Sequence, residues 1–398
     1  TWLRQGGYDF DYVSDNFLDQ AMVVNGNIKL PGGEYKVLVI PECDHMPLET
    51  FKKLLSLSAE GAKIVFDGSL PGDFPGLTNL EANRKELSKL KNSIHAIAPT
   101  ESDNNLVIDN GEVVVTKLFP GLLDKMGVKA ENIADKGIGY VRRKYTDGNI
   151  YFFANQQSKS LSGWVKLAVV AKSAAIFDPV TGRSGVAKVR EGKDGTEVFL
   201  QLVPDESLIL KTWADKKIDG NAWDYHQPDG KPVVLKGKWN LSFVDGTPAV
   251  KQEFVLDTLK SWTDLNNNEL KSFAGTGRYT LKFTLPNDVV DNWQLNLGKV
   301  CESAHVWING KDAGIWWSIP FSSNIGQYLK KGENTLEIEV TNLSANRLAD
   351  LDRRGVNWRI FKEINIVDLN YKPFNASSWK IMDSGLIGPV TLTPEKKY

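Results

Sequence analysis

The sequence predicts a multidomain, β-rich protein in which an α/β domain precedes two antiparallel β-sandwiches, the second of them a jelly roll. A strand–helix–strand pattern occupies the first third of the chain. Alternating apolar and polar runs with turn residues follow, and regularly spaced alternating strands then fill the last part. The expected boundaries are 1–137 for the α/β domain, 138–215 for a small β-sandwich, 216–235 for a linker and 236–398 for the jelly roll.

The α/β domain is predicted from one βαβ unit. Residues 35–41 (YKVLVIP) and 62–68 (AKIVFDG) are short apolar runs typical of buried strands. Between them, residues 47–63 place leucines and a phenylalanine on one helical face, and such crossovers join parallel strands. Further helices expected at 80–93 and 118–127 favour a flavodoxin-like or amidotransferase-like domain.

Cys43 and His45 raise the question of catalysis in this domain. They follow the first predicted strand, at the end of the sheet where open α/β folds bind ligands. The chain has no Gly-x-Cys-x-Gly elbow and no glycine-rich phosphate loop there. We interpret Cys43 as a packed side chain and the domain as structural. Esterase or transferase activity through Cys43 is the alternative.

Composition narrows the classes of function. The chain has 398 residues, 41% hydrophobic and 24% charged, with a net charge of −1, which is typical of a globular protein and disfavours nucleic acid or anionic membranes as partners. Its apolar runs are all shorter than the ~20 residues that a membrane helix needs. Because residues 1–15 (TWLRQGGYDFDYVSD) start directly with apolar and aromatic residues, we expect the tail of a longer polypeptide; a mature protein without its leader is the alternative.

The first candidate binding site is the stretch HVWINGKDAGIWWSIPF, residues 305–321. Its Asn-Gly pair predicts a tight hairpin, and side chains alternate between the faces of a strand, so Trp316 and Trp317 should point to opposite faces. One indole is then core and the other faces outward, where an indole beside polar groups is typical of sugar binding; closing a domain interface is the alternative. The candidate carbohydrate-binding residues here are Trp307, Asn309, Trp316 and Trp317.

The second candidate site is the charged segment 346–359, which we expect to be a loop. Its charges suit exposed ion pairs worth under ~1 kcal/mol each, or arginine forks that bind the carboxylates of acidic pectic glycans. A buried ion-pair network that holds the loop on the sandwich is the third interpretation. The candidate residues are Arg347, Asp350, Arg353, Arg354 and Trp358.

No metal site can be assigned from the sequence. Asp9, Asp11 and Asp15 offer oxygen ligands for calcium, but they lack the glycine and the final glutamate of an EF-hand loop. A helix that begins near Ser14, capped by Ser14 or Asp15, explains them more simply. The four histidines are not spaced as metal ligands. Calcium within the jelly roll stays an open alternative without chosen ligands.

Several runs carry a resemblance to known families. Residues 275–286 (GTGRYTLKFTLP) and 295–314 (LNLGKVCESAHVWINGKDAG) resemble the galactose-binding-like jelly roll of many glycoside hydrolases, similar to the sugar-binding domain of family 2 β-galactosidases. The run NRLADLDRRGVNWRIFKEINIVDLNYKPFNASSWKIMDSGLIGPVTL, residues 346–392, is more specific. With GYDFDYVSDNFL, residues 7–18, it resembles the C-terminal half of glycoside hydrolase family 106, the α-L-rhamnosidases.

This resemblance implies an exported, periplasmic or extracellular enzyme of plant-polysaccharide degradation whose chemistry belongs to an N-terminal (β/α)8 barrel with carboxylates and calcium. The sequence contains no succession of eight βα units, so no catalytic residue is assigned to this chain. We expect an accessory C-terminal part that binds glycan or supports the barrel, with the upstream barrel and carbohydrate as partners. A stand-alone carbohydrate-binding module, a purely structural role, and the tail of a family 2 or family 42 β-galactosidase are the alternatives.

Overall fold

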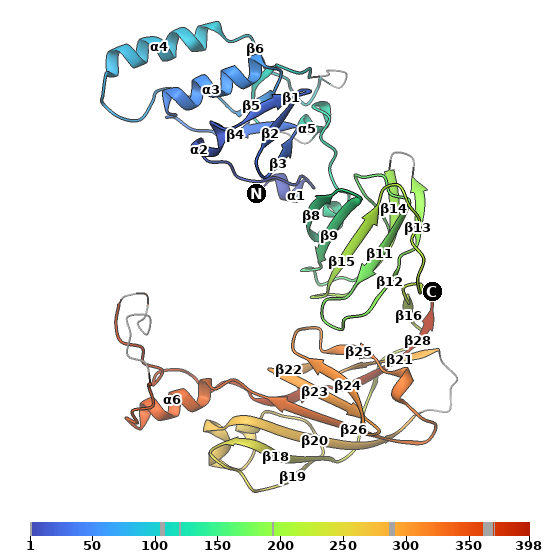
Figure 1. The fold of residues 1–398 in the computed structure, drawn as a ribbon. Helices are drawn as coiled ribbons and strands as arrows, with labels where there is room; N and C mark the ends of the chain where they lie inside the picture. The colour runs from blue at the N-terminus through green and yellow to red at the C-terminus, as the bar shows by residue number, and fades with distance from the viewer. Residues whose placement is uncertain are drawn as a thin grey trace. The chain divides into compact units, whose positions relative to one another are not determined.

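The computed structural model describes residues 2–103, 108–118, 121–192, 195–285, 291–360, 369 and 371–398. The chain forms two compact units (Figure 1). Unit 1 comprises Thr1–Lys144, Trp164–Lys172 and Val189–Val198, and unit 2 comprises Tyr145–Gly163, Ser173–Lys188 and Phe199–Tyr398. Strands predominate over helices, and the predicted fold class, multidomain and β-rich, is confirmed.

The centre of unit 1 is a parallel sheet with the strand order β4-β5-β7-β6. Helix α3 joins β4 to β5 and lies between α4 and the sheet (Figure 1), so the predicted βαβ unit is confirmed. Phe51 and Leu54 of α3 are buried with Phe66 of β5 in one core cluster. The bounds are β4 Val37–Ile40, α3 Leu48–Ala59, β5 Lys63–Asp67, α4 Leu80–Ser93, β6 Ala96–Ile97 and β7 Val113–Thr116.

The helix predicted at 118–127 is shorter in the structure. Only α5, Leu122–Lys125, forms, because Gly121 before it and Gly127 after it both adopt positive φ and interrupt the helix. Residues 119 and 120 lie outside the described residues. The remaining short helices of unit 1 are α1 Trp2–Gln5, α2 Asp15–Leu18 and η1 Ala134–Lys136.

Unit 1 also contains a small antiparallel sheet that the sequence analysis did not predict. Strands β1, β2 and β3 span Met22–Val24, Asn27–Leu30 and Gly33–Tyr35. Asn25 and Gly26 join β1 to β2, and both have positive φ, as a two-residue hairpin turn requires.

A smaller β-region follows the α/β domain. Strands β12, β11, β15 and β9 are antiparallel neighbours in one sheet. Tyr151, Phe153, Leu208 and Leu210 alternate along two of these strands and are buried. The bounds are β8 Gly139–Tyr145, β9 Gly148–Ala154, β10 Leu161–Lys166, β11 Ser173–Phe177, β12 Ser184–Val186, β13 Val189–Gly192, β14 Gly195–Leu202 and β15 Ser207–Trp213.

The rest of unit 2 is an antiparallel sandwich of two main sheets, which we call the large sandwich. One sheet has the order β19-β18-β20-β26-β23-β24 and the other β16-β28-β21-β25, with β17 also paired to β28. Their inner faces share one core that includes Trp239, Trp262 and Tyr279. The bounds of the first sheet are β18 Trp239–Thr247, β19 Phe254–Leu256, β20 Ala274–Thr284, β23 Ser303–Ile308, β24 Lys311–Trp316 and β26 Glu333–Thr341.

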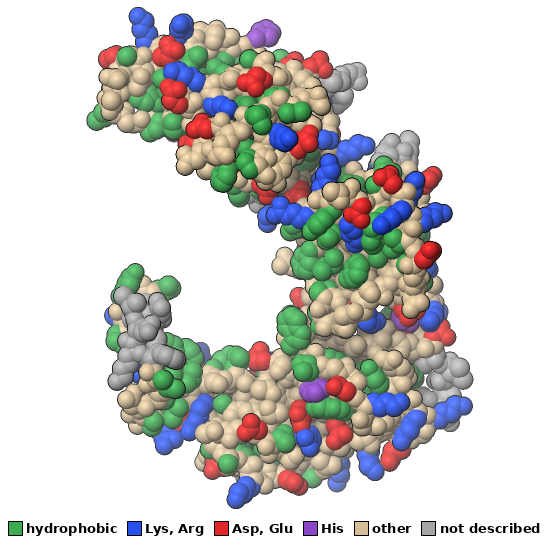
Figure 2. Space-filling view, in the orientation of Figure 1, with side chains coloured by type: hydrophobic (Ala, Val, Ile, Leu, Met, Phe, Trp, Pro, Cys, Tyr) green, Lys and Arg blue, Asp and Glu red, His purple; other side chains and the backbone are tan. Residues whose placement is uncertain are grey.

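The segment 216–235, predicted as a linker, contains two of the strands of the second sheet. The bounds of that sheet are β16 His226–Pro228, β17 Val233–Val234, β21 Asn292–Asn296, β25 Ser322–Asn324 and β28 Thr391–Lys397. Shorter elements complete the sandwich: η2 Trp262–Asp264, η3 Asn268–Ser272, β22 Lys299–Cys301, η4 Gly326–Tyr328, α6 Ala345–Arg353 and β27 Gly385–Gly388. On the face shown in Figure 2, basic and acidic side chains are interspersed, which agrees with the small net charge.

Candidate functional site

The hairpin β23–β24 forms the first candidate site. Asn309 and Gly310 connect its strands, and both have positive φ, as predicted for this turn. Along β23, Val306 and Ile308 are buried, whereas His305 and Trp307 are only partly buried and face the opposite side. The hairpin therefore presents His305 and Trp307 on the outer face of the sheet.

The two adjacent tryptophans lie in opposite environments. Trp316 is 6% exposed and belongs to the core of the large sandwich, and its Nε1 donates to the carbonyl of Ala313 at 3.3 Å. Trp317 is 61% exposed. The opposite environments expected for this pair are confirmed, although Trp317 lies one residue beyond β24, and of the two only Trp317 can offer its ring to a ligand.

Polar and aromatic side chains surround the outward residues of the hairpin. The rings of His305 and Trp307 have their centroids 3.7 Å apart. His305 Nε2 lies 3.0 Å from Asp312 Oδ1. The hydrogen bond from the backbone N–H of Gly314 and, to a smaller extent, the one from His305 lower the pKa of Asp312. We call His305, Trp307, Asp312, Ile315 and Trp317 the β23–β24 face.

The neighbouring strand extends the polar character of this face. On β26, Glu339 pairs with His305 and Glu337 pairs with Trp307 across the sheet. Directly paired residues point to the same side of a sheet, so both carboxylates flank the aromatic pair. Aromatic rings beside hydrogen-bonding groups make this face chemically suited to a sugar.

Sequence reasoning did not assign Asp312 and Ile315 to this face, because a register shift between Val306 and Trp307 decides their positions. The shift places Asp312 rather than Ala313 opposite Trp307. Asn309 was predicted to bind sugar, yet its side chain is engaged within the fold. Its Nδ2 donates to Tyr328 O at 3.0 Å and Asn334 Oδ1 at 2.8 Å, and its Oδ1 accepts from Thr335 N at 3.1 Å.

The second candidate site is partly helical where a loop was expected over 346–359, and that expectation is wrong for residues 346–353, which belong to α6 (Ala345–Arg353). Arg347 and Arg354 each lie 3.3 Å from Asp350, at the i,i+3 and i,i+4 spacings that bring side chains together on a helix. Asn346 is buried and exchanges two hydrogen bonds of 2.8 Å with the backbone of Met382. These bonds fix the helix to the segment that follows.

Asp352 is the centre of a hydrogen-bonded network beside α6. Its side chain is 5% exposed and accepts from Ala376 N at 2.7 Å, Trp358 Nε1 at 2.8 Å and Arg359 Nη2 at 3.1 Å. Burial alone would raise the pKa of Asp352, but the hydrogen bonds from Ala376 and Trp358 and the charge of Arg359 lower it.

Arg353 also binds within the fold, donating to the carbonyls of Ser377 and Trp379 at 3.0 and 3.1 Å. Arg353 and Trp358 are therefore engaged with their own segment, which favours the buried-network interpretation over ligand binding.

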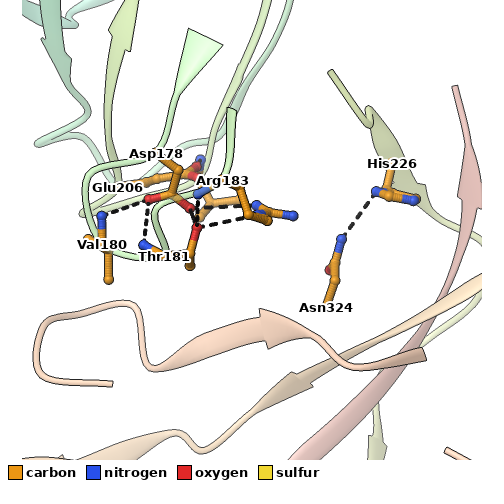
Figure 3. A network of polar contacts seen from close by, with 8 residues as sticks. Asp178, Val180, Thr181, Arg183, Glu206, His226 and Asn324 are labelled. Atoms are coloured by element: carbon orange, nitrogen blue, oxygen red, sulfur yellow. Dashed lines mark hydrogen bonds and ion pairs between the residues drawn. The ribbon is translucent and has the colours of Figure 1, made fainter. Parts of the chain in front are cut away.

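A second polar network lies in unit 2 (Figure 3). Asp178, after β11, accepts from the N–H groups of Val180 and Thr181 at 2.9 and 3.2 Å, and Arg183 lies 3.6 Å from it. Figure 3 shows Glu206 beside Asp178. Burial raises the pKa of Glu206 to about 7, although the N–H of Val203 opposes the shift. The sequence offers no signal for this carboxyl, because its environment is assembled from distant segments.

His226 and Asn324 form a further pair in Figure 3, with Nδ1 and Nδ2 3.1 Å apart. Burial lowers the pKa of His226. Glu395 is a buried residue of β28, the strand with which His226 of β16 pairs. Burial raises the pKa of Glu395 to about 7. Both networks are held by turns and strand pairs, so we assign them a structural role.

The α/β domain offers no developed reactive site at Cys43. The thiol is partly buried against a core cluster, and burial, then Asp44, raises its pKa, which disfavours the thiolate that a nucleophile needs.

The aspartates considered as calcium ligands have other surroundings in the fold. Asp11 accepts a hydrogen bond from the hydroxyl of Tyr35 at 2.8 Å. Helix α2 begins directly after Ser14, but the side chain of Ser14 makes no capping hydrogen bond. Within the described ranges, His, Cys, Asp and Glu side chains form no group of three that could hold a metal ion. None of the helices described is long and apolar enough to cross a membrane.

Comparisons with known proteins agree with the resemblance in the motifs. Residues 4–190 match the model of glycoside hydrolase family 106, described as alpha-L-rhamnosidase. A protein of Formosa agariphila that is named as a β-glucuronidase is 30% identical over 181 residues, which are 41% of this chain and 16% of that protein.

The solved structure of a rhamnosidase from Novosphingobium sp. PP1Y is 26% identical with a TM-score of 0.67 and matches 97% of this chain but 36% of its own. The chain thus spans well under half the length of either relative. The predicted resemblance is confirmed: residues 4–190 are similar to the alpha-L-rhamnosidases of glycoside hydrolase family 106, and nearly the whole chain is similar to the solved rhamnosidase.

Proposed function

We propose that this chain is the accessory, non-catalytic part of an exported glycoside hydrolase similar to α-L-rhamnosidases, and that it binds plant polysaccharide. The match to the rhamnosidase leaves most of that enzyme outside the aligned region. In the part of this chain that the structure describes, the parallel sheet has four strands, whereas a (β/α)8 barrel needs eight. These facts support a division in which another part of the polypeptide carries the catalytic carboxylates.

The observation that carries the binding role is the exposed ring of Trp317, directly after the hairpin that carries the His305–Trp307 ring pair. The face of an indole packs on the C–H groups of a sugar ring, while carboxylates accept hydrogen bonds from its hydroxyls. Asp312 and Glu337 supply such acceptors, whereas Glu339 already accepts hydrogen bonds from Arg278 of β20. The β23–β24 face therefore offers both kinds of contact that a glycan requires.

A supporting role toward a catalytic domain is the second candidate, and α6 with its following segment favours it. The hydrogen bonds of Asp352 join α6 to Trp358, Arg359 and Ala376, and several large apolar side chains among the described residues between 343 and 382 are exposed. They are Leu343, Ile360, Tyr371, Trp379, Ile381 and Met382. Several exposed apolar side chains within one part of the chain favour a contact surface.

The binding role is tested by isothermal titration of the chain with rhamnogalacturonan oligosaccharides. We expect saturable binding that Trp317→Ala weakens by about tenfold, since losing one stacked ring removes on the order of 1 kcal/mol or more. Tyr12→Ala, which removes an exposed ring from unit 1, is the matched control and should leave binding unchanged. Equal affinities of the wild type and Trp317→Ala would contradict the proposal.

A further inference from the structure

A pocket of about 290 Å³ lies where the chain crosses from one sheet of the large sandwich to the other. Residues 235–238 make the crossing, because Val234 still pairs with β28 whereas Trp239 begins β18. The ends of β20 and β21 line the other side. The volume is at the lower end of ligand pockets, which hold roughly 300–1,000 Å³, so it suits one sugar ring rather than a longer glycan.

The floor of this pocket is aromatic and apolar. Phe283 and Trp293 line it together with Leu235 and Leu392. Both aromatic side chains are almost fully buried, so only a small part of each reaches the pocket. The small exposed areas of these side chains offer apolar contacts to the C–H groups of a pyranose ring.

Trp293 also offers an unused hydrogen-bond donor. Its Nε1–H has no hydrogen-bond partner among the described residues. It is nevertheless not a buried unsatisfied atom, because Nε of Arg359 is the only such side-chain atom in those residues. The indole N–H of Trp293 therefore reaches solvent, in a residue whose small exposed area lines the pocket. A buried ring with an accessible N–H is suited to a ligand hydroxyl or carboxylate.

The rim of the pocket carries an excess of positive charge. Lys282 pairs with Glu333 at 3.2 Å, whereas Lys236 is exposed and has no partner within the described ranges. One ammonium group thus remains for a ligand. Because a lone cation beside an apolar floor favours an anionic group on an otherwise C–H-rich ring, the charge selects for a sugar that carries a carboxylate.

We propose that this pocket binds a single acidic sugar residue, a uronic acid, with its carboxylate on Lys236 and its ring on Phe283 and Trp293. The site goes beyond the proposed function, since none of its lining residues belongs to β23 or β24. The chain would then hold a polysaccharide at two places, by stacking on the β23–β24 face and by charge at this pocket.

The test is a titration of the chain with sodium D-galacturonate and, in parallel, with D-galactose, followed by saturation-transfer NMR and tryptophan fluorescence. We expect saturable binding of galacturonate, with galactose weaker by about three- to tenfold because it lacks the carboxylate. Lys236→Gln should weaken galacturonate binding by a similar factor and leave galactose unaffected. Lys251→Gln removes another exposed lysine outside the pocket and should change neither affinity.

Both lysines are exposed, so the folded state should survive each substitution, and a circular dichroism melt verifies this. Trp317→Ala should leave galacturonate binding intact, which separates the pocket from the β23–β24 face. Equal affinity for galactose and galacturonate, unchanged binding by Lys236→Gln, or no saturable binding of galacturonate would each overturn the proposal.

Discussion

Trp316 and Trp317 are neighbours in the chain, yet one indole lies in the core of the large sandwich and the other lies in solvent. Trp316 is the last residue of β24 and packs into the core, whereas Trp317 comes directly after the end of the strand. Two residues of the same type at adjacent positions therefore serve stability and surface contact separately.

Removing these two rings should have unequal effects on stability. We expect Trp316→Ala to lower the free energy of unfolding by about 3–5 kcal/mol, because it leaves a large cavity in the core. Trp317→Ala should change it by about 0.5 kcal/mol or less, as exposed substitutions usually do. Urea titration followed by circular dichroism measures both values. A comparable loss for the two variants would show that the assigned environments are wrong.

The network around Asp352 should contribute more to stability than the ion pairs around Asp350. Asp352→Asn places an amide group among three donors and removes the charge facing Arg359, so we expect a loss of about 2–4 kcal/mol. Asp350→Asn, the matched control on the same helix, breaks partly exposed pairs and should cost under about 1 kcal/mol. Denaturant unfolding with hydrogen exchange of residues 345–353 separates the two outcomes; equal losses would contradict a buried network.

Two glutamates of unit 2, the half-buried Glu206 and the buried Glu395, predict that stability falls as pH rises. Glu206 and Glu395 have their pKa raised by burial from 4.5 to about 7 in the folded chain. Between pH 4.5 and 7 the folded state therefore binds more protons than the unfolded state, and the free energy of unfolding decreases through this window. The lowered pKa of His226 acts in the opposite direction, but on one group instead of two.

The measurement compares thermal midpoints of the wild type and Glu395→Gln at pH 5 and pH 8. Gln keeps the shape without the charge, so the variant should melt at least as high as the wild type at pH 8 and show a smaller change between the two pH values. For Glu395, which is 5% exposed, the difference should be on the order of 2–3 kcal/mol. Parallel pH profiles for both proteins would rule out a titrating Glu395.

The proposed absence of catalytic residues predicts that this chain alone does not hydrolyse an aryl α-L-rhamnoside. The same assay on a polypeptide extended by the upstream region of its natural gene should show release of the aryl group. Hydrolysis needs two carboxyl groups that flank the bond, and we place them outside this chain. Activity of this chain alone, abolished by replacing an acid of α6, would refute the assignment.

Much of the fold could be predicted because its signals are local. The apolar runs of β4 and β5 and the helical stripe of α3 are each readable within a dozen residues, and the Asn309–Gly310 turn specifies its hairpin. The opposite environments of Trp316 and Trp317 were also predicted correctly, although Trp317 lies one residue beyond β24. These features depend on periodicity and turn chemistry, which sequence retains.

The misses have specific physical causes. Residues 345–353 are dense in charge, which resembles a loop, and the i,i+3 and i,i+4 pairing through Asp350 that supports α6 was overlooked. The Asn25–Gly26 turn carried the same signal as Asn309–Gly310 but joins strands too short to show alternation. The pocket beside Lys236 brings together residues from positions 233 to 392, so tertiary packing alone creates it.

The pairing of β28 with β16, β17 and β21 has a consequence for biosynthesis. Residues 391–397 are the inner strand that these three partners share, although two of those partners are synthesised more than 150 residues earlier. During synthesis, the edges of β16 and β17 that pair with β28 therefore have no partner until the ribosome has made the remainder of the sandwich. A chaperone that shields strand edges during this interval should raise the yield of folded protein, and a stop codon before residue 391 should leave a product that aggregates.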